Sequence, residues 1–194
     1  MKKSLWIVLG VVVLIGALIG GNYNKLVTGE EQVKQSWAQV ENVYQRRADL
    51  IPNLVETVKG YAAHERETLE GVTEARAKIS QVQLSPDVIN NPALLEKFQA
   101  SQGALGSALS HLLALSERYP DLKANQNFLE LQTQLEGTEN RITVERMRFN
   151  DAAQGFNTLR RVFPTIVVAN LLSFKEKAYF KAAEGASKVP AVKF

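Results

Sequence analysis

The sequence predicts an all-α protein: an N-terminal transmembrane helix, an elongated bundle of three long helices, a short C-terminal helix and an extended tail. Three observations predict this fold class. The 194-residue chain has an uncharged apolar segment close to its start, apolar residues then recur at alternating spacings of three and four, and no stretch shows the sustained alternation of apolar and polar residues typical of a β-strand. These patterns divide the chain into an anchor at residues 1–24, a helical bundle at 25–185 and a tail at 186–194.

The anchor is predicted from residues 4–24, which contain no charged side chain. A helix of this length covers roughly 30 Å, the thickness of the hydrocarbon core of a bilayer. Trp6 and Tyr23 lie near its ends, where aromatic rings favour the membrane interface. A cleaved signal peptide is the alternative, because it also has a charged start and an apolar core. Cleavage needs a small residue three positions before the cut, and isoleucine or leucine stands there at each available site, so we favour an uncleaved anchor that contacts membrane lipid.

The residues that flank and line the anchor bear on its orientation and pairing. Lys2 and Lys3 precede the apolar segment and favour a cytoplasmic N-terminus, which places the body outside the cytoplasm, although two lysines on the other flank make this bias small. Gly16 and Gly20 form a GxxxG step through which two such helices can approach closely. Glycine is equally well tolerated in a lone anchor, so this step leaves both a monomer and an oligomer open.

The first body helix is predicted from a long apolar seam. A capping box of Thr28 and Glu31 is expected to open it, and Pro52 to kink it or to open a turn nearby. The seam runs through Val33, Trp37, Val40, Tyr44, Arg47, Ile51, Leu54, Val58, Tyr61, Glu65, Thr68, Val72, Ala75, Ile79 and Val82. A helix of about 55 residues exceeds the next one by roughly 40 Å. We therefore expect Trp37, Val40 and Tyr44 to lack intramolecular cover and to meet another subunit or partner.

Two further long helices follow. The second is predicted from about Ala93 to Tyr119, after the Pro- and Asn-rich residues 85–92. The third stops at Pro164. Its apolar seam runs through Phe128, Leu131, Leu135, Thr138, Ile142, Glu145, Phe149, Ala152, Phe156, Leu159 and Phe163. Residues 163–174 form an apolar segment too short to span a bilayer, which we interpret as a short helix that caps the bundle, with a membrane-surface contact as the alternative. The tail at 186–194 is expected to be extended.

Composition argues against catalysis. The chain has no cysteine and two histidines, His64 and His111, neither of which belongs to a Glu-x-x-His motif. Nucleotide-binding, zinc-protease and serine-hydrolase motifs are absent from the sequence. Without Lys2 and Lys3, the net charge of +3 becomes 21 basic against 20 acidic side chains, which is too balanced for a typical nucleic-acid binder. We predict no catalytic, cofactor-binding or metal-binding residue.

Charged residues on the apolar seams invite two interpretations. Arg47 and Glu65 lie on the first seam and Glu145 on the third. Because a buried charge is costly unless it is paired, we favour an interhelical network that sets helix register over a ligand site. The arginines of the third helix have glutamates nearby, so a solvated face of mixed charge is favoured over a surface for anionic lipid.

Several long motifs resemble the LemA family, and together they cover essentially the whole chain. They are Gln45–Tyr61 with Ala62–Glu65, Tyr23-Asn24 before Leu26-Val27, Trp37–Asn42, Glu117–Ala124, Glu139–Ile142, and Phe163-Pro164 with Tyr179-Phe180. The resemblance implies a single-pass protein of the bacterial cytoplasmic membrane with a helical body, no established catalytic activity, and relatives associated with intracellular membrane organelles. It also implies signature positions at Arg46, Arg47, Asp49, Pro52, Asn53, Lys59, His64 and Glu65.

Three functional hypotheses follow. The first is a membrane-anchored helical interaction or scaffold protein that self-associates and takes part in membrane organisation. The second is an accessory adaptor or sensor for a membrane protease or signalling complex, which binds partners through the first body helix. The third, a hydrolase or metal enzyme, is disfavoured by the histidine count and the missing motifs. We therefore predict a non-enzyme whose partners are membrane lipid, further copies or other membrane proteins, with no nucleic acid and no small-molecule substrate.

Overall fold

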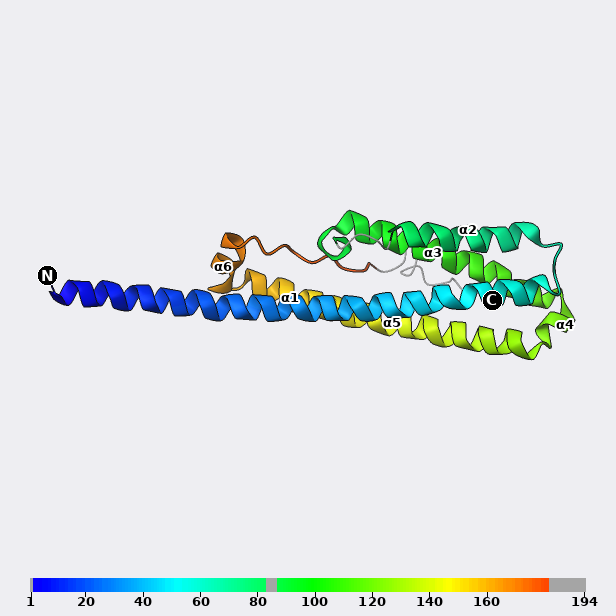
Figure 1. Ribbon diagram of the computed structural model, residues 1–194, viewed down its shortest axis with the longest axis horizontal. Helices are drawn as coiled ribbons and strands as arrows, with labels where there is room; N and C mark the ends of the chain where they lie inside the picture. The colour runs from blue at the N-terminus through cyan, green and yellow to red at the C-terminus, as the bar shows by residue number, and fades with distance from the viewer. Residues whose placement is uncertain (1, 83–86, 182–194) are drawn as a thin grey trace, which may run out of the picture.

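The computed structural model describes residues 2–82 and 87–181 and confirms the all-α fold class (Figure 1). The molecule is a rod whose longest helix runs from the N-terminus to the far end, which we call the distal end. The elements are α1 (Lys2–Lys59), α2 (Arg66–Val82), the 3-10 turn η1 (Val88–Asn90), α3 (Pro92–Ala114), the 3-10 turn η2 (Leu115–Glu117), α4 (Pro120–Lys123), α5 (Gln126–Arg161) and α6 (Thr165–Leu171). The predicted tail at 186–194 lies outside the described residues.

Helix α1 joins the apolar N-terminal segment and the body without a break over 58 residues. The predicted capping box is therefore wrong, because Thr28 lies in the middle of a helix and has no helix start to cap. Pro52 is also accommodated inside α1. Proline cannot donate to the carbonyl four residues earlier, and that carbonyl, of Ala48, instead accepts a hydrogen bond of 3.0 Å from Nε of Arg76 on α2.

The long first body helix predicted from the seam is in fact two helices. α1 ends at Lys59, and the chain reverses over residues 60–65 before α2 begins. The turn keeps the apolar spacing partly in phase: Val58 and Ala62 are buried and bonded through their backbones, while Tyr61 is exposed. A seam of helical period therefore continued across a turn, which is why the sequence pattern did not reveal the break.

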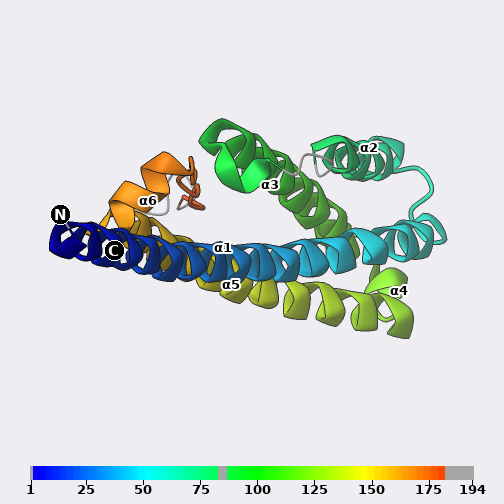
Figure 2. The ribbon, with the colours of Figure 1, turned by 60° about the vertical axis from the view of Figure 1, so that its left-hand side comes forward.

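Helices α2 and α3 form a hairpin on the distal half of α1, and α5 returns antiparallel to α1 along most of the rod (Figures 1 and 2). Two asparagine caps set the starts of the returning helices. Oδ1 of Asn91 accepts from the backbone N–H groups of Ala93 and Leu94, and Oδ1 of Asn125 accepts from that of Phe128. Pro92 at the first position of α3 fits such a start.

The end of α5 differs from the prediction in one respect. Phe163, taken from the seam as a core residue, is 83% exposed, because α5 ends at Arg161 and the chain turns through a cis Phe163–Pro164 bond into α6. α6 is the predicted short helix, and its Thr165, Val168 and Ala169 pack onto the bundle. It ends in a Schellman motif, in which the N–H of Phe174 donates to the carbonyl of Ala169.

Residues 172–181, which we call the strap, leave α6 through a turn at Leu172 and Ser173 and then run, without helix, along the face of α1 and α5 that the α2–α3 hairpin leaves uncovered (Figure 1). The strap, together with α3 and α5, overturns the expectation that Trp37, Val40 and Tyr44 lack intramolecular cover. Val40 and Tyr44 are buried, and the Trp37 ring lies between those of Phe98, Phe149 and Phe180 at centroid distances of 5.4, 5.4 and 6.1 Å. Cover therefore comes from the same chain: from α3 through Phe98, from α5 through Phe149 and from the strap through Phe180.

Two glycines on the facing helices α1 and α5 offer a test of this packing. A Cβ on Gly29 would lie 3.3 Å from Cδ2 of Phe156, whereas a Cβ on Gly155 would meet nothing within 4 Å. We expect Gly155→Ala to raise the free energy of unfolding by about 1 kcal/mol through helix propensity. Gly29→Ala should raise the free energy of unfolding by less than this, and Gly29→Leu should lower it by about 1–3 kcal/mol through overpacking. Denaturation of the detergent-solubilised protein, followed by circular dichroism, measures all three; equal effects of the two alanines would contradict the close approach.

Candidate functional site

A groove between α3 and α5, with α1 as its floor, brings polar side chains of all three helices together. We call it the α3–α5 groove. Its floor is formed by Tyr44 and Arg47, its walls carry both signs of charge, and Lys181 of the strap also lines it. The lining residues are Tyr44, Arg47, Glu96, Gln99, Ala100, Gln102, Gly103, Gly106, Glu139, Arg146 and Lys181.

Arg47 is the centre of this groove. Its side chain is 4% exposed, and its guanidinium donates to Glu139 Oε2 at 2.9 Å, to the carbonyl of Gln102 at 3.2 Å and to the side-chain oxygen of Gln102. It also lies 5.1 Å from the ring centre of Tyr44, whose pKa is raised by burial. Arg47 thus joins α1 to both α3 and α5, as the interhelical interpretation of the seam charges predicted.

Two donors of this network have no hydrogen-bond partner among the residues that the structure describes. They are Nε of Arg47 and Nε2 of Gln102, and both atoms are buried. Buried donors are normally satisfied by protein or by ordered water. The floor of the groove therefore keeps hydrogen-bonding capacity for water or for an acceptor group on a bound molecule.

The other seam charges divide between the two interpretations. Glu65 links the α1–α2 turn to the η2–α4 turn, because its carboxylate accepts from the Tyr119 hydroxyl at 3.0 Å and lies 3.2 Å from Arg118. The same hydrogen bond raises the pKa of Tyr119. Glu145 pairs instead with Arg148 on its own helix, at 2.8 Å, so the interhelical prediction is wrong for this residue. One turn along a helix brings a partner within reach without a second helix.

The strap is held by a ladder of side-chain carboxamides. Each of three carboxamides both donates to the carbonyl and accepts from the N–H of one strap residue: Asn157 for Lys177, Asn150 for Phe180 and Gln99 for Lys181, at distances of 2.8–3.3 Å. An extended segment on helices has no neighbouring strand to satisfy its backbone, and an amide side chain supplies the same donor and acceptor as a peptide group.

Lys177 is the buried charge of the strap. Its side chain is 1% exposed, and Nζ lies 2.5 Å from Glu30 Oε1 and 2.8 Å from Asn90 Oδ1, and 5.1 Å from the ring centre of Phe156. One ammonium group therefore connects the strap to α1, to α5 and to the η1 turn. The geometry is that of a structural pair, since a lysine so enclosed requires a carboxylate.

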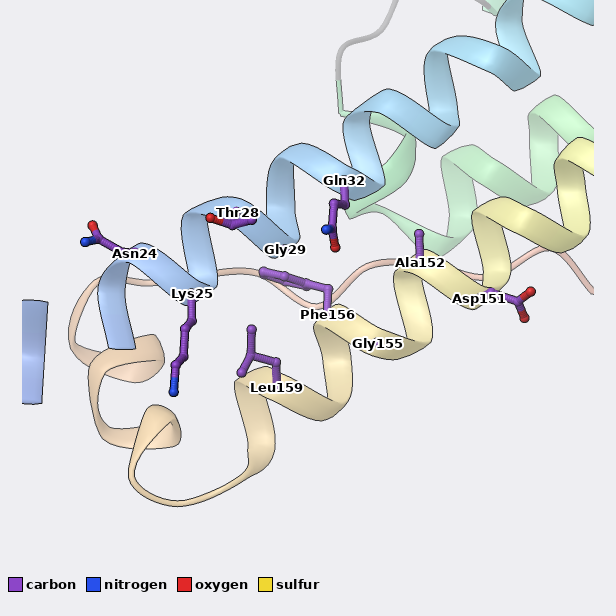
Figure 3. Close-up of a pocket in the computed structure, with 10 residues that line it drawn as sticks. All are labelled: Asn24, Lys25, Thr28, Gly29, Gln32, Asp151, Ala152, Gly155, Phe156 and Leu159. Carbon is purple, nitrogen blue, oxygen red and sulfur yellow. The ribbon is translucent and has the colours of Figure 1, made fainter. Parts of the chain in front are cut away.

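A second groove lies between α1 and α5 nearer the apolar segment (Figure 3). Phe156 and Leu159 point toward Gly29 across it, Lys25 points toward the α5–α6 turn, and Asp151 projects away at the other end. These charged groups are spread along the groove. The groove shows the close approach of α1 and α5, with no convergence of groups on one point.

The signature positions implied by the LemA resemblance do not form one site. Of the eight, Arg47 is buried and Glu65 partly buried, and the other six are exposed along α1 and the α1–α2 turn. Asp49 accepts from Gln45 at 2.7 Å and Lys59 lies 3.5 Å from Glu56, both within α1. In the described part of the chain, three or more His, Cys, Asp or Glu side chains do not gather where they could hold a metal ion.

Sequence reasoning missed the polar residues that hold the groove and the strap. They are Asn90, Gln99, Gln102, Glu139, Asn150, Asn157 and Lys177. A faint signal exists for two of them, because Asn150 and Asn157 lie seven residues apart and so on one face of α5, beside the apolar seam. The partners of all these residues lie 20–147 residues away in the sequence, and a periodic pattern carries no information on such pairings.

Comparison with known proteins places the chain in a family. Residues 36–194 match the sequence profile of the LemA family. The chain belongs to the LemA family. The chain is 27% identical over 164 residues to Protein LemA of Metamycoplasma hominis, a match that covers 84% of this chain and 71% of the relative. It is 28% identical over 194 residues to Magnetosome protein MamQ 2 of Paramagnetospirillum magneticum, covering 90% of this chain and 70% of the relative. It is 26% identical over 189 residues to Magnetosome protein MamQ of Magnetospirillum gryphiswaldense, covering 89% of this chain and 69% of the relative.

The apolar end of α1 adds to this family assignment. By length and composition, α1 is the one described helix that could cross a bilayer, and almost all of its apolar part is exposed. Together with the family match and the relatives, it indicates a membrane-associated protein.

The Arg47 network of this LemA-family chain can be tested against the neighbouring arginine. We expect Arg47→Ala to lower the free energy of unfolding by about 2–3 kcal/mol, because charged hydrogen bonds to two helices are lost. Arg47→Lys should recover part of the loss, since a lysine cannot reproduce the guanidinium fork. Arg46→Ala, on the exposed side of α1, is the control and should change the value by less than about 0.5 kcal/mol. Urea denaturation in detergent provides the measurement, and equal losses at Arg46 and Arg47 would refute the assigned role.

The carboxamide ladder predicts a local effect on the strap. Asn157→Ala removes both bonds to the Lys177 backbone, which should lower the free energy of local opening by about 2 kcal/mol. Hydrogen exchange at the Lys177 amide should then accelerate about 30-fold. Asn140→Ala, at an exposed position of the same helix, should leave this rate unchanged. An unchanged rate in Asn157→Ala would show that side-chain packing alone holds the strap.

Proposed function

We propose that this protein is a non-catalytic, membrane-anchored scaffold that self-associates and presents the α3–α5 groove to other proteins at a fixed height above a membrane. The observation that carries the proposal is the continuity of α1. One uninterrupted helix includes the apolar segment and the groove floor, so the body cannot swing freely about the anchor as it would on a flexible linker. At 1.5 Å per residue, Arg47 stands roughly 35 Å beyond the end of the apolar segment.

The groove supports an interaction role through its chemistry. Its rim combines the carboxylates of Glu96 and Glu139 with the cations of Arg146 and Lys181, and its floor keeps the unsatisfied donors of Arg47 and Gln102. Gly103 and Gly106 have no side chain on the α3 wall, so a polypeptide segment can approach the backbone of α3 there.

The anchor supports self-association. A Cβ on Gly16 or Gly20 would meet nothing within 4 Å. Both glycines lie about 120–160° around α1 from Asn22, the residue that contacts α6, so α6 leaves their face open to a second anchor. The relatives named magnetosome proteins suggest that the scaffold acts on an organised membrane. The lysines ahead of the apolar segment favour a body outside the cytoplasm.

The natural chain has no cysteine, so single-cysteine variants report contacts and sidedness without background. Asn24→Cys, one turn beyond Gly20, and Gly103→Cys, in the groove, are treated with a bis-maleimide in intact membranes. We expect Asn24→Cys to give a crosslinked product of twice the 21.5 kDa mass. The double substitution Gly16→Leu and Gly20→Leu should abolish this product, while Gly10→Leu on another face of α1 should not.

The same variants report the side of the membrane on which the body lies. A membrane-impermeant maleimide added to intact cells should label Gly103→Cys.

The outcomes separate the alternatives. Self-links support the scaffold, whereas links from Gly103→Cys to one recurrent second protein, without self-links, support the alternative of an accessory adaptor or sensor for a membrane protease or signalling complex. Loss of every link at both positions would overturn an interaction role. Labelling of Gly103→Cys only after the membrane is made permeable would place the body in the cytoplasm.

A further inference from the structure

The junction between α5, α6 and the strap exposes a concentrated apolar surface, which we call the α6 shoulder. It consists of Val162, Phe163, Ile166, Val167, Leu171 and Leu172, which are 36–83% exposed. Beyond Tyr23, the described part of the chain has eleven exposed large apolar side chains, and six of them lie within these eleven consecutive residues. The other five are scattered over the body, as is usual for a soluble surface, but a gathering of six marks a site of contact.

The shoulder is fixed beside the end of the apolar segment of α1. Oγ1 of Thr165 donates to Oδ1 of Asn22 at 3.0 Å, in a buried contact, and the ring of Phe174 lies 6.2 Å from that of Tyr23. Figure 1 shows α6 against α1 at this level, where the body begins. Leu18, one turn before Asn22 and on the same side of α1, is 51% exposed, so the apolar surface continues from the shoulder onto the anchor.

The two faces of α6 differ as they do in an interfacial helix. Thr165, Val168 and Ala169 face the bundle and are at most 4% exposed, while Val167 and Leu171 on the outer face are 59% and 70% exposed. In a soluble protein the outer face would be polar. Exposed Arg161 and Lys175 flank the shoulder on its two sides, which suits the anionic headgroups of a bilayer.

We propose that the α6 shoulder inserts into the surface of the same membrane that α1 crosses, as a second attachment point. The occupant is a lipid surface because the apolar side chains are level with the end of the apolar segment, where a bilayer that holds the anchor must present its interface. This inference rests on the proposed membrane anchor. Two attachment points, one along α1 and one beside it, fix the tilt of the rod and the direction in which the α3–α5 groove faces.

Depth-sensitive fluorescence tests the proposal on the full chain. Single-cysteine variants carry the fluorophore NBD, and the protein is reconstituted in vesicles of phosphatidylcholine and phosphatidylglycerol that contain a lipid with a nitroxide near the headgroup end of its acyl chain. Val167→Cys reports the shoulder, and Met147→Cys on α5, with the same 59% exposure, is the matched control. We expect the nitroxide lipid to quench the Val167 label several-fold more than the Met147 label, and aqueous iodide to show the opposite order.

A third position separates failure of this inference from failure of the anchor. Leu9→Cys lies inside the apolar segment and must be quenched by nitroxide lipids if α1 crosses the bilayer. If nitroxide lipids quench the Leu9 label but iodide reaches the Val167 label as readily as the Met147 label, the shoulder does not contact lipid, while the anchor still crosses the bilayer. Protection of Val167 from both quenchers, with energy transfer between labelled copies, would overturn it in favour of a second protein copy.

A substitution supplies the independent check. Val167→Glu places a charge on the outer face of α6, away from its packed side, and should reduce lipid quenching of a label at Leu171→Cys several-fold while the helical circular dichroism is kept. Met147→Glu, at the matched position of α5, should leave the Leu171 label unchanged. An unchanged Leu171 label in both variants would contradict insertion of the shoulder.

Discussion

The long apolar seam of helix α1 must be buried, and the rest of the chain packs so as to bury it. Its buried seam runs from Leu26 to Val58, and an apolar seam of that length must be covered along all of it. Helix α5 covers one side over most of this distance, but the α2–α3 hairpin reaches only the distal half (Figure 1). The α6 helix and the strap fill the remainder. The order of elements after α5 therefore follows from the length of α1.

The strap also explains where the buried polar groups of the body lie. An extended segment on a surface of helices must satisfy its backbone through side chains, because it has no strand beside it. Asn157, Asn150 and Gln99 do so, and the Lys177–Glu30 pair fixes the register. Such contacts contribute little net stability compared with apolar burial, but a shifted strap would leave buried donors and a buried charge unsatisfied. We infer that the polar contacts select one position for the strap, while Phe180 and its aromatic neighbours supply the burial.

The proposed functions use two levels of the same rod. Near the apolar segment, the α6 shoulder and the Gly16–Gly20 face point away from each other around α1, so lipid contact and pairing of anchors are compatible. Farther out, the Arg47 network holds α1, α3 and α5 together and forms the floor of the α3–α5 groove. Because α1 connects both levels without a hinge, the orientation of the anchor determines where the groove faces.

The sequence by itself determined the all-α class, the apolar anchor segment, the family and most of the core. Helical period alone identified Val33, Val40 and Ile51 on α1, and Phe128, Ile142 and Phe156 on α5, since burial follows the face of a helix. Arg47 stood out for the same reason, as a charge on an apolar face. Only the tertiary structure decided the turn at 60–65, the cover over Trp37 and the partners of Arg47 and Lys177. The period of apolar residues shows which face of a helix is buried. It could not reveal the turn, because the turn preserves that period. It could not reveal the packing over Trp37 or the charge pairs, because these join residues far apart in the chain.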